Sequence, residues 1–238
     1  MRMPSVRACV AVLVLSSSLR AQSLVQLTIE GEIDRPGGAW VDVEVVAVPG
    51  TDGARSASLG LHLAEKTAAA DVVALLTRRM EAAGMHAVFA SERTGPRTLA
   101  HVFVEDCVAV NLHLGHGLAP TVTLCETAPA SLKVVPPIES KGKGFLTIAA
   151  STWHAPSQTP NRLSIELELD DRRAPTMIAE DLVTRSIQLG WLAERLKHEA
   201  WHPTGMADGS IVKGSSIALQ TTGADWRMEI GIGPPSRR

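Results

Sequence analysis

Alternation of apolar and polar residues is the feature that most limits what this chain can fold into. The segment LSIELEL (163–169) places four apolar residues in strict alternation with polar ones, which is typical of a β-strand with one buried face. The same interpretation fits five further segments, namely residues 24–30, 40–48, 58–64, 131–135 and 145–151. The chain is therefore expected to be rich in antiparallel strands.

One helix is predicted after the third strand of each half. In TAAADVVALLTRRMEAAG, Thr67 is the predicted N-cap and Gly84 the predicted end of the helix. The second helical segment, TMIAEDLVTRSIQLGWLAERL, begins at Thr176, which lies 109 residues after Thr67. Gly205 likewise follows Gly95 at an offset of 110 residues. These offsets predict an internal repeat.

We therefore predict an α+β fold of two tandem modules, each an antiparallel sheet with one helix, in the order strand-strand-strand-helix-strands. The first module spans residues 22–127 and the second spans residues 128–238, with a linker near residues 127–130. Each half is predicted to close with a β-hairpin, and the second of these covers residues 215–232.

The first 21 residues have the pattern of a secretory signal peptide. Arg2 and Arg7 give a positive start, residues 8–15 form an apolar run, and residues 16–21 are small or polar. Cleavage is expected after residue 21, with a cut after Ser18 as the alternative. The apolar run is far shorter than the ~20 residues of a membrane-spanning helix, so no membrane span is expected. The expected location is secreted, periplasmic or in the cell envelope.

Charge and aromatic content exclude some classes of partner. Without residues 1–21, the chain has 20 basic against 25 acidic residues and no basic cluster that would indicate nucleic acid. It has no Tyr and three Phe, which argues against a broad aromatic platform for ligands. The expected partner is an unknown protein or surface ligand, and self-association into an oligomer stays open.

CVAVNLHLGHGLAPTVTLC (107–125) is predicted to form the first hairpin, with its loop at residues 115–117. This register places Cys107 directly opposite Cys125, within disulfide range. In an exported protein such a pair is expected to be bonded, with free thiols or bonds between chains as alternatives. The register leaves His113 roughly 20 Å from Cys107, so no shared metal site is expected.

The predicted order of elements resembles the small α+β modules that recur in tandem in phage tail proteins and large bacterial surface proteins. Their helix opens with a Thr followed by Ala-rich sequence and apolar residues, as in TAAADVVALL and, more loosely, TMIAEDLVTR. The resemblance covers roughly residues 23–233 and rests on this pattern. It implies a binding, adhesive or assembly role and transfers no catalytic residue.

A second, local resemblance concerns HEAWHPTGMAD (198–208). This segment matches H-E-x-x-H-x-x-G-x-x-D and resembles the zinc site of the metzincin metalloproteases. The resemblance implies that His198, His202 and Asp208 bind zinc and that Glu199 is the general base. In such a site the two histidines lie on one face of a helix.

Pro203 argues against that helix, because proline lacks the N–H group and disfavours helical backbone at the residue before it. The 110-residue offset also places HEAWH over residues 88–92, a predicted strand without metal ligands. We therefore favour an exported, non-catalytic binding, adhesion or assembly protein of the cell envelope that needs no cofactor. A secreted zinc metalloprotease is the alternative function.

Overall fold

The computed structural model of the chain describes residues 24–47, 56–94, 97–125, 129–136, 142–153, 161–197, 199–222 and 225–232. The predicted signal peptide lies outside these residues, as do residues 126–128 at the predicted linker.

The described residues form fourteen strands and two helices. The strands of the first half are β1 (Leu24–Gly31), β2 (Ala39–Ala47), β3 (Ser56–Leu63), β4 (Ala87–Thr94), β5 (Arg97–Glu105), β6 (Cys107–Gly115) and β7 (Leu118–Cys125). The strands of the second half are β8 (Pro129–Val135), β9 (Lys143–Trp153), β10 (Asn161–Asp170), β11 (Trp191–Arg195), β12 (Trp201–Met206), β13 (Ile211–Thr222) and β14 (Asp225–Ile232). The helices are α1 (Ala69–Ala82) and α2 (Pro175–Gln188).

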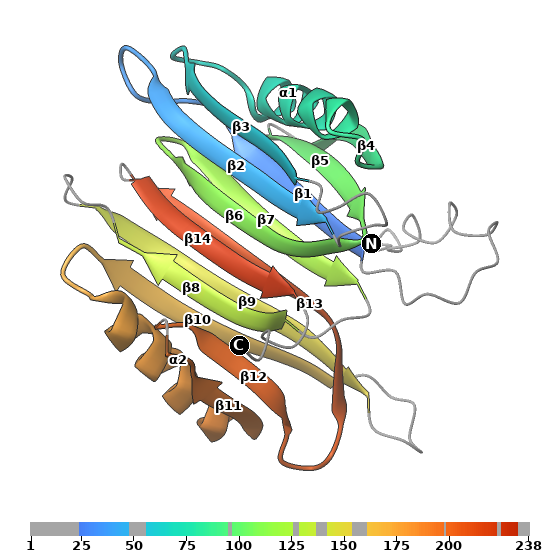
Figure 1. Cartoon of the computed structure of the whole chain (residues 1–238). Coiled ribbons are helices and arrows are strands. Elements are labelled where there is room, and N and C mark those ends of the chain that lie inside the picture. Colours follow the sequence, from blue (N-terminus) through green and yellow to red (C-terminus); the bar gives the residue numbers. More distant parts are fainter. Residues whose placement is uncertain are drawn as a thin grey trace, which may run out of the picture.

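The strands form two seven-stranded antiparallel sheets that stack as a sandwich (Figure 1). The first sheet has the order β10-β9-β13-β7-β1-β5-β4, and the second has the order β11-β12-β8-β14-β6-β2-β3. Helix α1 contacts β3, β4 and β5, and α2 contacts β10, β11 and β12. Helix α1 thus bridges the edge strands β3 and β4 at one side of the sandwich, and α2 bridges the edge strands β10 and β11 at the other side. The predicted α+β class, with antiparallel sheets and two helices, is confirmed.

Each half of the chain contributes to both sheets. The first half supplies β7-β1-β5-β4 to the first sheet and β6-β2-β3 to the second, while the second half supplies β14-β8-β12-β11 to the second sheet and β13-β9-β10 to the first. Pairing of β7 with β13 and of β6 with β14 joins the halves by backbone hydrogen bonds in both sheets. The expectation that each half has a sheet of its own therefore differs from the structure.

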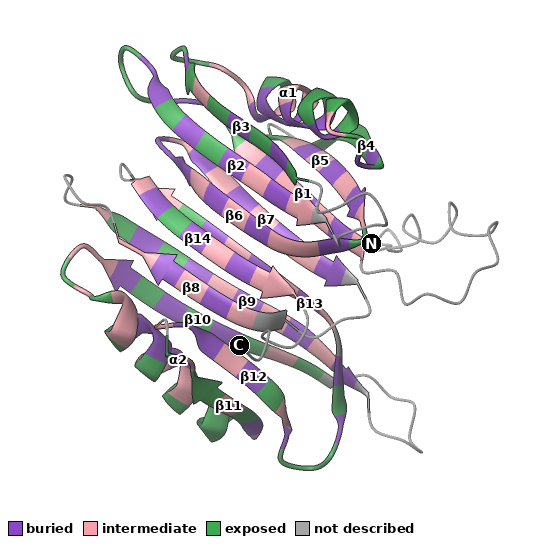
Figure 2. Cartoon of the chain, viewed as in Figure 1, coloured by how far each residue is buried: buried purple, intermediate pink, exposed green. Residues whose placement is uncertain are grey.

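Alternating side chains fill the space between the sheets. In β10, Ile165, Leu167 and Leu169 are buried, whereas the glutamates between them are exposed. Figure 2 shows the same alternation of buried and less buried residues along other strands. The core also contains three fully buried tryptophans, Trp191, Trp201 and Trp226. The period-2 pattern of the sequence thus correctly predicted which strand residues form the core.

Helix α1 buries one face that includes Val72, Leu76 and Met80. The predicted N-cap at Thr67 is wrong, because Ala68 occupies that position without a side-chain hydrogen bond. The Thr67 hydroxyl instead donates to the Ala64 carbonyl at 2.7 Å.

The spacing of the two helices differs from the predicted offset of 109 residues. Helices α1 and α2 begin at Ala69 and Pro175, which are 106 residues apart. Gly84 and Gly190, which follow the two helices with positive φ, keep the same spacing. Thr176 lies inside α2, so its predicted equivalence to Thr67 is wrong. Residues 88–92 lie in β4, which has the sheet position of β11, so their equivalence to HEAWH is also wrong.

Strands β6 and β7 do not form the predicted hairpin. Strand β6 pairs with β2 and β14, whereas β7 pairs with β1 and β13 in the other sheet. The chain therefore crosses between the sheets at residues 115–117. The predicted hairpin of β13 and β14 is wrong for the same reason, since these strands also lie in different sheets.

Candidate binding surface

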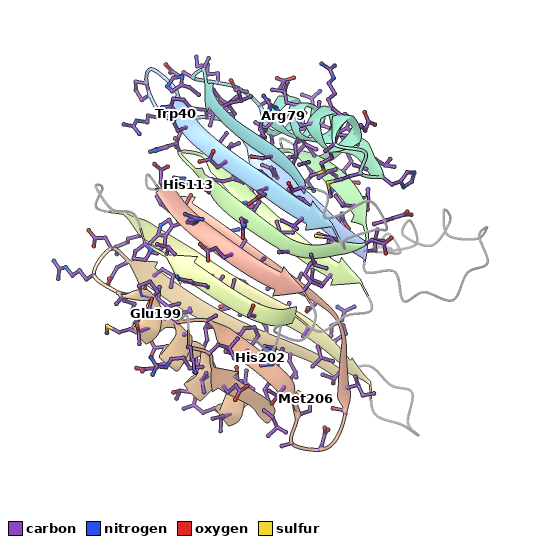
Figure 3. All side chains as sticks on the ribbon, viewed as in Figure 1. Trp40, Arg79, His113, Glu199, His202 and Met206 are labelled. Atoms are coloured by element: carbon purple, nitrogen blue, oxygen red, sulfur yellow. The ribbon has the colours of Figure 1, made fainter. Side chains whose placement is uncertain are left out.

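The zinc-like motif does not lie on a helix. HEAWHPTGMAD spans the turn between β11 and β12 and continues along β12, so Glu199 lies in the turn and His202 on the strand (Figure 3). Glu199 has a φ of 61°, a left-handed conformation that a right-handed helix does not contain. His198 lies outside the described residues. The helical face required for two zinc-binding histidines is therefore not formed, as Pro203 predicted.

The acidic residues of this motif have structural partners. Oε1 of Glu199 accepts a hydrogen bond from the hydroxyl of Thr176 at 2.7 Å, which ties the turn to α2. Oδ1 of Asp208 accepts hydrogen bonds from the backbone N–H and the hydroxyl of Ser210 at 2.8 and 2.6 Å. Within the described ranges, no group of three or more His, Cys, Asp or Glu side chains is placed to hold a metal ion. Because His198 lies outside the described residues, the zinc site itself stays an untested alternative.

His202 is half-buried on β12, opposite Glu194 of β11. Burial lowers the pKa of His202 below 6.5, and the nearby Glu194 carboxylate partly opposes this shift. In the part of the chain that the structure describes, the buried Nδ1 atom has no hydrogen-bond partner. The imidazole therefore favours its neutral form.

Cys107 and Cys125 are not cross-strand neighbours, because β6 and β7 belong to different sheets. Cys107 pairs with Ala47 of β2, and Cys125 pairs with Leu24 of β1. The Sγ atom of Cys107 donates to the Ala109 carbonyl at 3.2 Å, and burial raises the pKa of this thiol to about 12. The side chain of Cys125 lies outside the described residues, so the disulfide stays a prediction.

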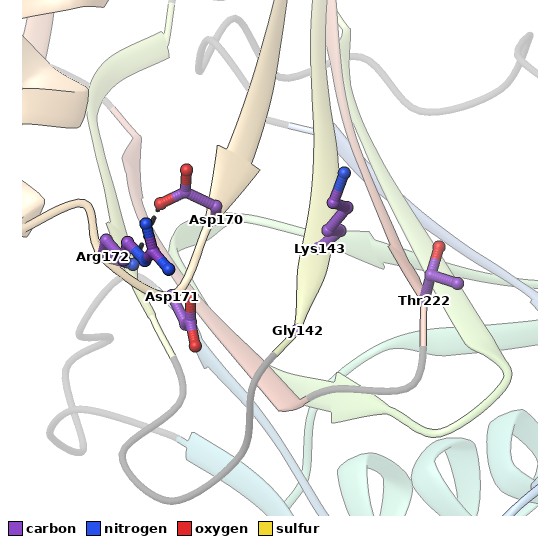
Figure 4. Close-up of a pocket in the computed structure, with 6 residues that line it drawn as sticks. All are labelled: Gly142, Lys143, Asp170, Asp171, Arg172 and Thr222. Atoms are coloured by element: carbon purple, nitrogen blue, oxygen red, sulfur yellow. Dashed lines mark hydrogen bonds between the residues drawn. The ribbon is translucent and has the colours of Figure 1, made fainter.

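An open depression of about 540 Å³ lies where β9 begins and where β10 and β13 end (Figure 4). Its lining residues are Gly142, Lys143, Asp170, Asp171, Arg172 and Thr222. Oδ1 of Asp170 accepts a hydrogen bond from the backbone of Arg172 at 2.9 Å, and Lys143 lies 3.6 Å from Glu168. The Asp170 carboxylate and the Lys143 ammonium thus each have a partner within the chain, in a site that is open to solvent, and this arrangement favours no particular ligand.

The outer face of the second sheet carries a better candidate. Alternation turns Val41, Val43 and Val45 of β2 into the core, so the residues between them point outward. Antiparallel pairing aligns these with outward residues of β3, β6 and β14. We name this region the Trp40 surface, and it comprises Trp40, Asp42, Glu44, Gly60, His62, Asn111, His113, Arg227 and Glu229.

Trp40 lies at the start of β2 with 64% of its surface exposed. Its ring centroid is 5.6 Å from that of His62 on β3, and the two rings meet edge to face at 74°. A Cβ at Gly38 would come within 2.8 Å of Cε1 of His62, so the backbone at Gly38 packs against the imidazole. The imidazole is thus held next to Trp40, while most of the indole stays open to solvent.

Asp42 lies two residues further along β2, on the same face as Trp40. One carboxylate oxygen, Oδ2, is 3.5 Å from Nδ1 of His113 on β6. The other, Oδ1, lies over Gly60 of β3, where a Cβ would approach it to 2.6 Å. Any side chain at position 60 would therefore displace the carboxylate. The Asp42 side chain is 60% exposed, so Oδ1 can accept a hydrogen bond from a ligand.

A second row of polar side chains crosses the same strands. Nδ2 of Asn111 donates to Oε2 of Glu44 at 2.9 Å, and Nε of Arg227 lies 3.1 Å from Oε1 of Glu229. Lys133 of β8 is the cross-strand partner of Glu229 on its other side. The Trp40 surface thus carries three carboxylates (Asp42, Glu44 and Glu229) and the guanidinium of Arg227, so it offers both acceptors and donors of hydrogen bonds.

Phe145 in the first sheet occupies a position comparable to that of Trp40 in the second sheet. Phe145 precedes the buried Leu146 on β9, as Trp40 precedes the buried Val41 on β2, and it is 45% exposed. Its cross-strand partners are Gln220 and Glu168. Among the described aromatic rings and imidazoles, none contacts Phe145. Trp40 and Phe145 are thus both exposed on outer faces, but in the described residues an imidazole packs against Trp40 and none packs against Phe145. His101 and Phe103 form another such pair, on β5 of the first sheet.

Sequence reasoning did not identify Trp40 as a site residue. The signal was present in WVDVEVVAV, because the alternation that buries the valines places Trp40, Asp42 and Glu44 together on the opposite face. Their neighbours on β6 and β14 could not be predicted, because the two predicted hairpins gave both strands the wrong partners.

Comparisons of the chain with protein-family models, with curated proteins and with solved structures found no match. Neither helix in the described residues is long and apolar enough to cross a membrane. Function is therefore inferred from the residues themselves.

Proposed function

We propose that this chain is an exported, non-catalytic binding protein of the cell envelope and that the Trp40 surface contacts its partner. The observation that carries this proposal is the exposure of Trp40. The indole of Trp is the largest apolar side chain, and Trp191, Trp201 and Trp226 are fully buried in the same protein. Trp40 instead keeps a large apolar face in water, which a ligand can cover with a gain in free energy.

The shape of the surface favours binding over catalysis. Catalytic sites are usually concave and exclude water, so that charged groups act strongly on the reacting atoms. The Trp40 surface lies on the outer face of a sheet, where Asp42 and His113 are both accessible to solvent. Groups in such a position can recognise a ligand, but they would act only weakly on a chemical step.

The symmetry of the strand order supports a tandem duplication. Adding seven to each strand number of the first half reproduces the strand order of the second half. The order β7-β1-β5-β4 becomes β14-β8-β12-β11, and β6-β2-β3 becomes β13-β9-β10. We therefore retain two modules, with a boundary near residues 127–128, as part of the proposal. The resemblance to tandem modules of phage tail and bacterial surface proteins agrees with a role in adhesion or assembly, and the signal-like residues 1–21 agree with export.

Co-sedimentation with cell-envelope fragments of the producing cells tests this function. The mature chain should sediment with the fragments, and Trp40→Ala should weaken sedimentation by about tenfold or more, as expected for an aromatic anchor. Phe145→Ala, which removes an exposed ring from the opposite sheet, is the matched control and should sediment like the wild type. Equal sedimentation of wild type and Trp40→Ala, or none by either protein, would refute the proposal.

A further inference from the structure

We infer that the Trp40 surface binds an uncharged oligosaccharide chain, with one sugar ring lying on the indole of Trp40. This inference rests on the proposed binding function and adds the chemical class of the ligand. Three properties of the surface carry it: an open aromatic ring, hydrogen-bonding groups beside that ring, and charges of both signs that are paired with one another.

The open ring supplies the apolar contact. One side of a sugar ring presents C–H groups, which pack on the face of an indole while the hydroxyl groups point sideways. Trp40 is 64% exposed, and the edge-to-face contact with His62 fixes its surroundings. An aromatic side chain loses little conformational entropy on binding, because it has only two rotatable side-chain bonds. Trp40 can therefore act as a rigid platform for one ring.

The neighbouring groups match the hydroxyls of such a ligand. A hydroxyl both donates and accepts hydrogen bonds, so it needs acceptors such as carboxylates and donors such as imidazole or amide N–H groups. Residues two apart on a strand are about 7 Å apart, which puts the Asp42 carboxylate beside a ring that lies on Trp40. Oδ1 of Asp42 accepts no hydrogen bond from the other described residues. His62 adds a polar ring nitrogen on the β3 side.

The pairing of carboxylates with basic groups selects against ionic ligands. Across neighbouring strands, Asp42 is followed by His113 and then by Arg227. The next row places Glu229 beside Lys133. A polyanion such as nucleic acid needs a continuous basic surface, and a cation held over an indole is favoured by unpaired carboxylates. The Asp42 carboxylate is shared with His113 at 3.5 Å, so an uncharged, hydroxyl-rich ligand fits the surface best.

Trp40 also lies beside an edge of the sheet. Strand β3 is the last strand of the second sheet on this side (Figure 1). Helix α1 contacts β3 at this edge, so an oligosaccharide whose first ring lies on Trp40 extends over the outer face of the sheet, where Trp40 and Asp42 are both exposed. This position suits a chain-like ligand better than a small molecule that requires enclosure on all sides.

Affinity electrophoresis of the mature chain in gels containing soluble neutral polysaccharides (a β-glucan, a xylan and a mannan) tests the inference. At least one should retard the wild type, and Trp40→Ala should weaken the interaction by about tenfold or more. Phe145→Ala should behave like the wild type. Asp42→Asn, which keeps an oxygen acceptor and removes the charge, should bind within about threefold, and about 0.5 M salt should change little because a neutral ligand releases no counterions.

Other results would overturn the ligand class. A large loss with Asp42→Asn together with strong salt dependence would indicate a cationic ligand. Retardation only by an anionic polysaccharide, or by none of the gels, would also overturn the inference. If Trp40-dependent sedimentation with envelope fragments persisted in these cases, the binding function would stand and only the oligosaccharide would fail. If that sedimentation were also absent, both would fail.

Discussion

Nε2 of His116 lies 2.6 Å from Oδ1 of Asp225, and this contact joins the two halves of the chain. His116 is in the loop that carries the chain from β6 to β7, and Asp225 begins β14. The imidazole is buried, and Nη1 of Arg35 lies 3.1 Å from the same nitrogen. His116 also has a left-handed φ of 50°, so the crossing loop holds it in an uncommon conformation.

Asp225→Ala should destabilise the protein by about 1–3 kcal/mol, because it removes the carboxylate that lies 2.6 Å from the buried imidazole of His116. Urea unfolding at neutral pH measures this change. Lys143→Ala is the control, because its ion pair with Glu168 is largely exposed and should contribute at most about 0.5 kcal/mol. Equal shifts of the midpoint for the two variants would show that the His116 contact adds no special stability.

The lowered pKa of His202 predicts a dependence of stability on pH. The unfolded chain, in which this histidine titrates near 6.5, binds more protons than the folded chain below that pH. The contribution of His202 to the free energy of unfolding is therefore fully present above about pH 6.5. It is lost as the pH falls toward the pKa that His202 has in the folded protein. His202→Gln should reduce the loss of unfolding free energy between about pH 7 and pH 5. An imidazole signal in NMR that titrates at the same pH in folded and urea-unfolded protein would contradict this.

Glu199→Gln should leave stability within about 0.5 kcal/mol of the wild type. Glutamine keeps a side-chain oxygen that can accept the hydrogen bond from Thr176, and the backbone conformation of the turn is unchanged. Thermal melting measures stability, and elemental analysis of the purified chain should find no stoichiometric zinc. Zinc that is lost in His202→Ala, together with chelator-sensitive cleavage of an unfolded substrate, would restore the protease alternative.

Cys107 should resist alkylation in the folded, reduced protein. Its pKa of about 12 leaves almost no thiolate at pH 8, and the side chain is buried. Reaction with iodoacetamide should become fast only in denaturant, as mass spectrometry would show. Peptide mapping without reductant tests the predicted bond to Cys125, and recovery of both cysteines as alkylatable thiols from exported protein would refute that bond.

Much of the fold was readable from local pattern. The alternation in residues 163–169 correctly predicted that Ile165, Leu167 and Leu169 are buried, and the helical periodicity located α1. The second predicted helical segment was too long, because its residues 191–195 form β11. Strand pairing could not be read in the same way. Residues 108–114 and 118–124 can place their apolar faces side by side in one sheet, or in opposite sheets that face each other across the core. The alternation is the same in both cases, so sequence alone did not distinguish a hairpin from a crossing between sheets.

The same limitation affected the sites. The HEAWH motif matched a helical zinc site in spacing, but spacing does not report the backbone conformation that turns two histidines to one face. The left-handed Glu199 and the strand at His202 remove that geometry. Trp40 was overlooked because strands often carry aromatic residues for packing alone. Only its exposure in the fold and its position beside Asp42 and His62 distinguish it from a core residue.

Hydroxyl-radical footprinting of the mature chain, alone and bound to envelope fragments, tests the central claim most directly, because it reports contact on every face at once. We expect protection to be concentrated at Trp40 and His62, while Phe145 on the opposite sheet and Ile187 on α2, both exposed in the free protein, oxidise at unchanged rates. Protection at Phe145 or Ile187 with Trp40 still fully oxidised would contradict the claim that this protein binds its partner through the Trp40 surface.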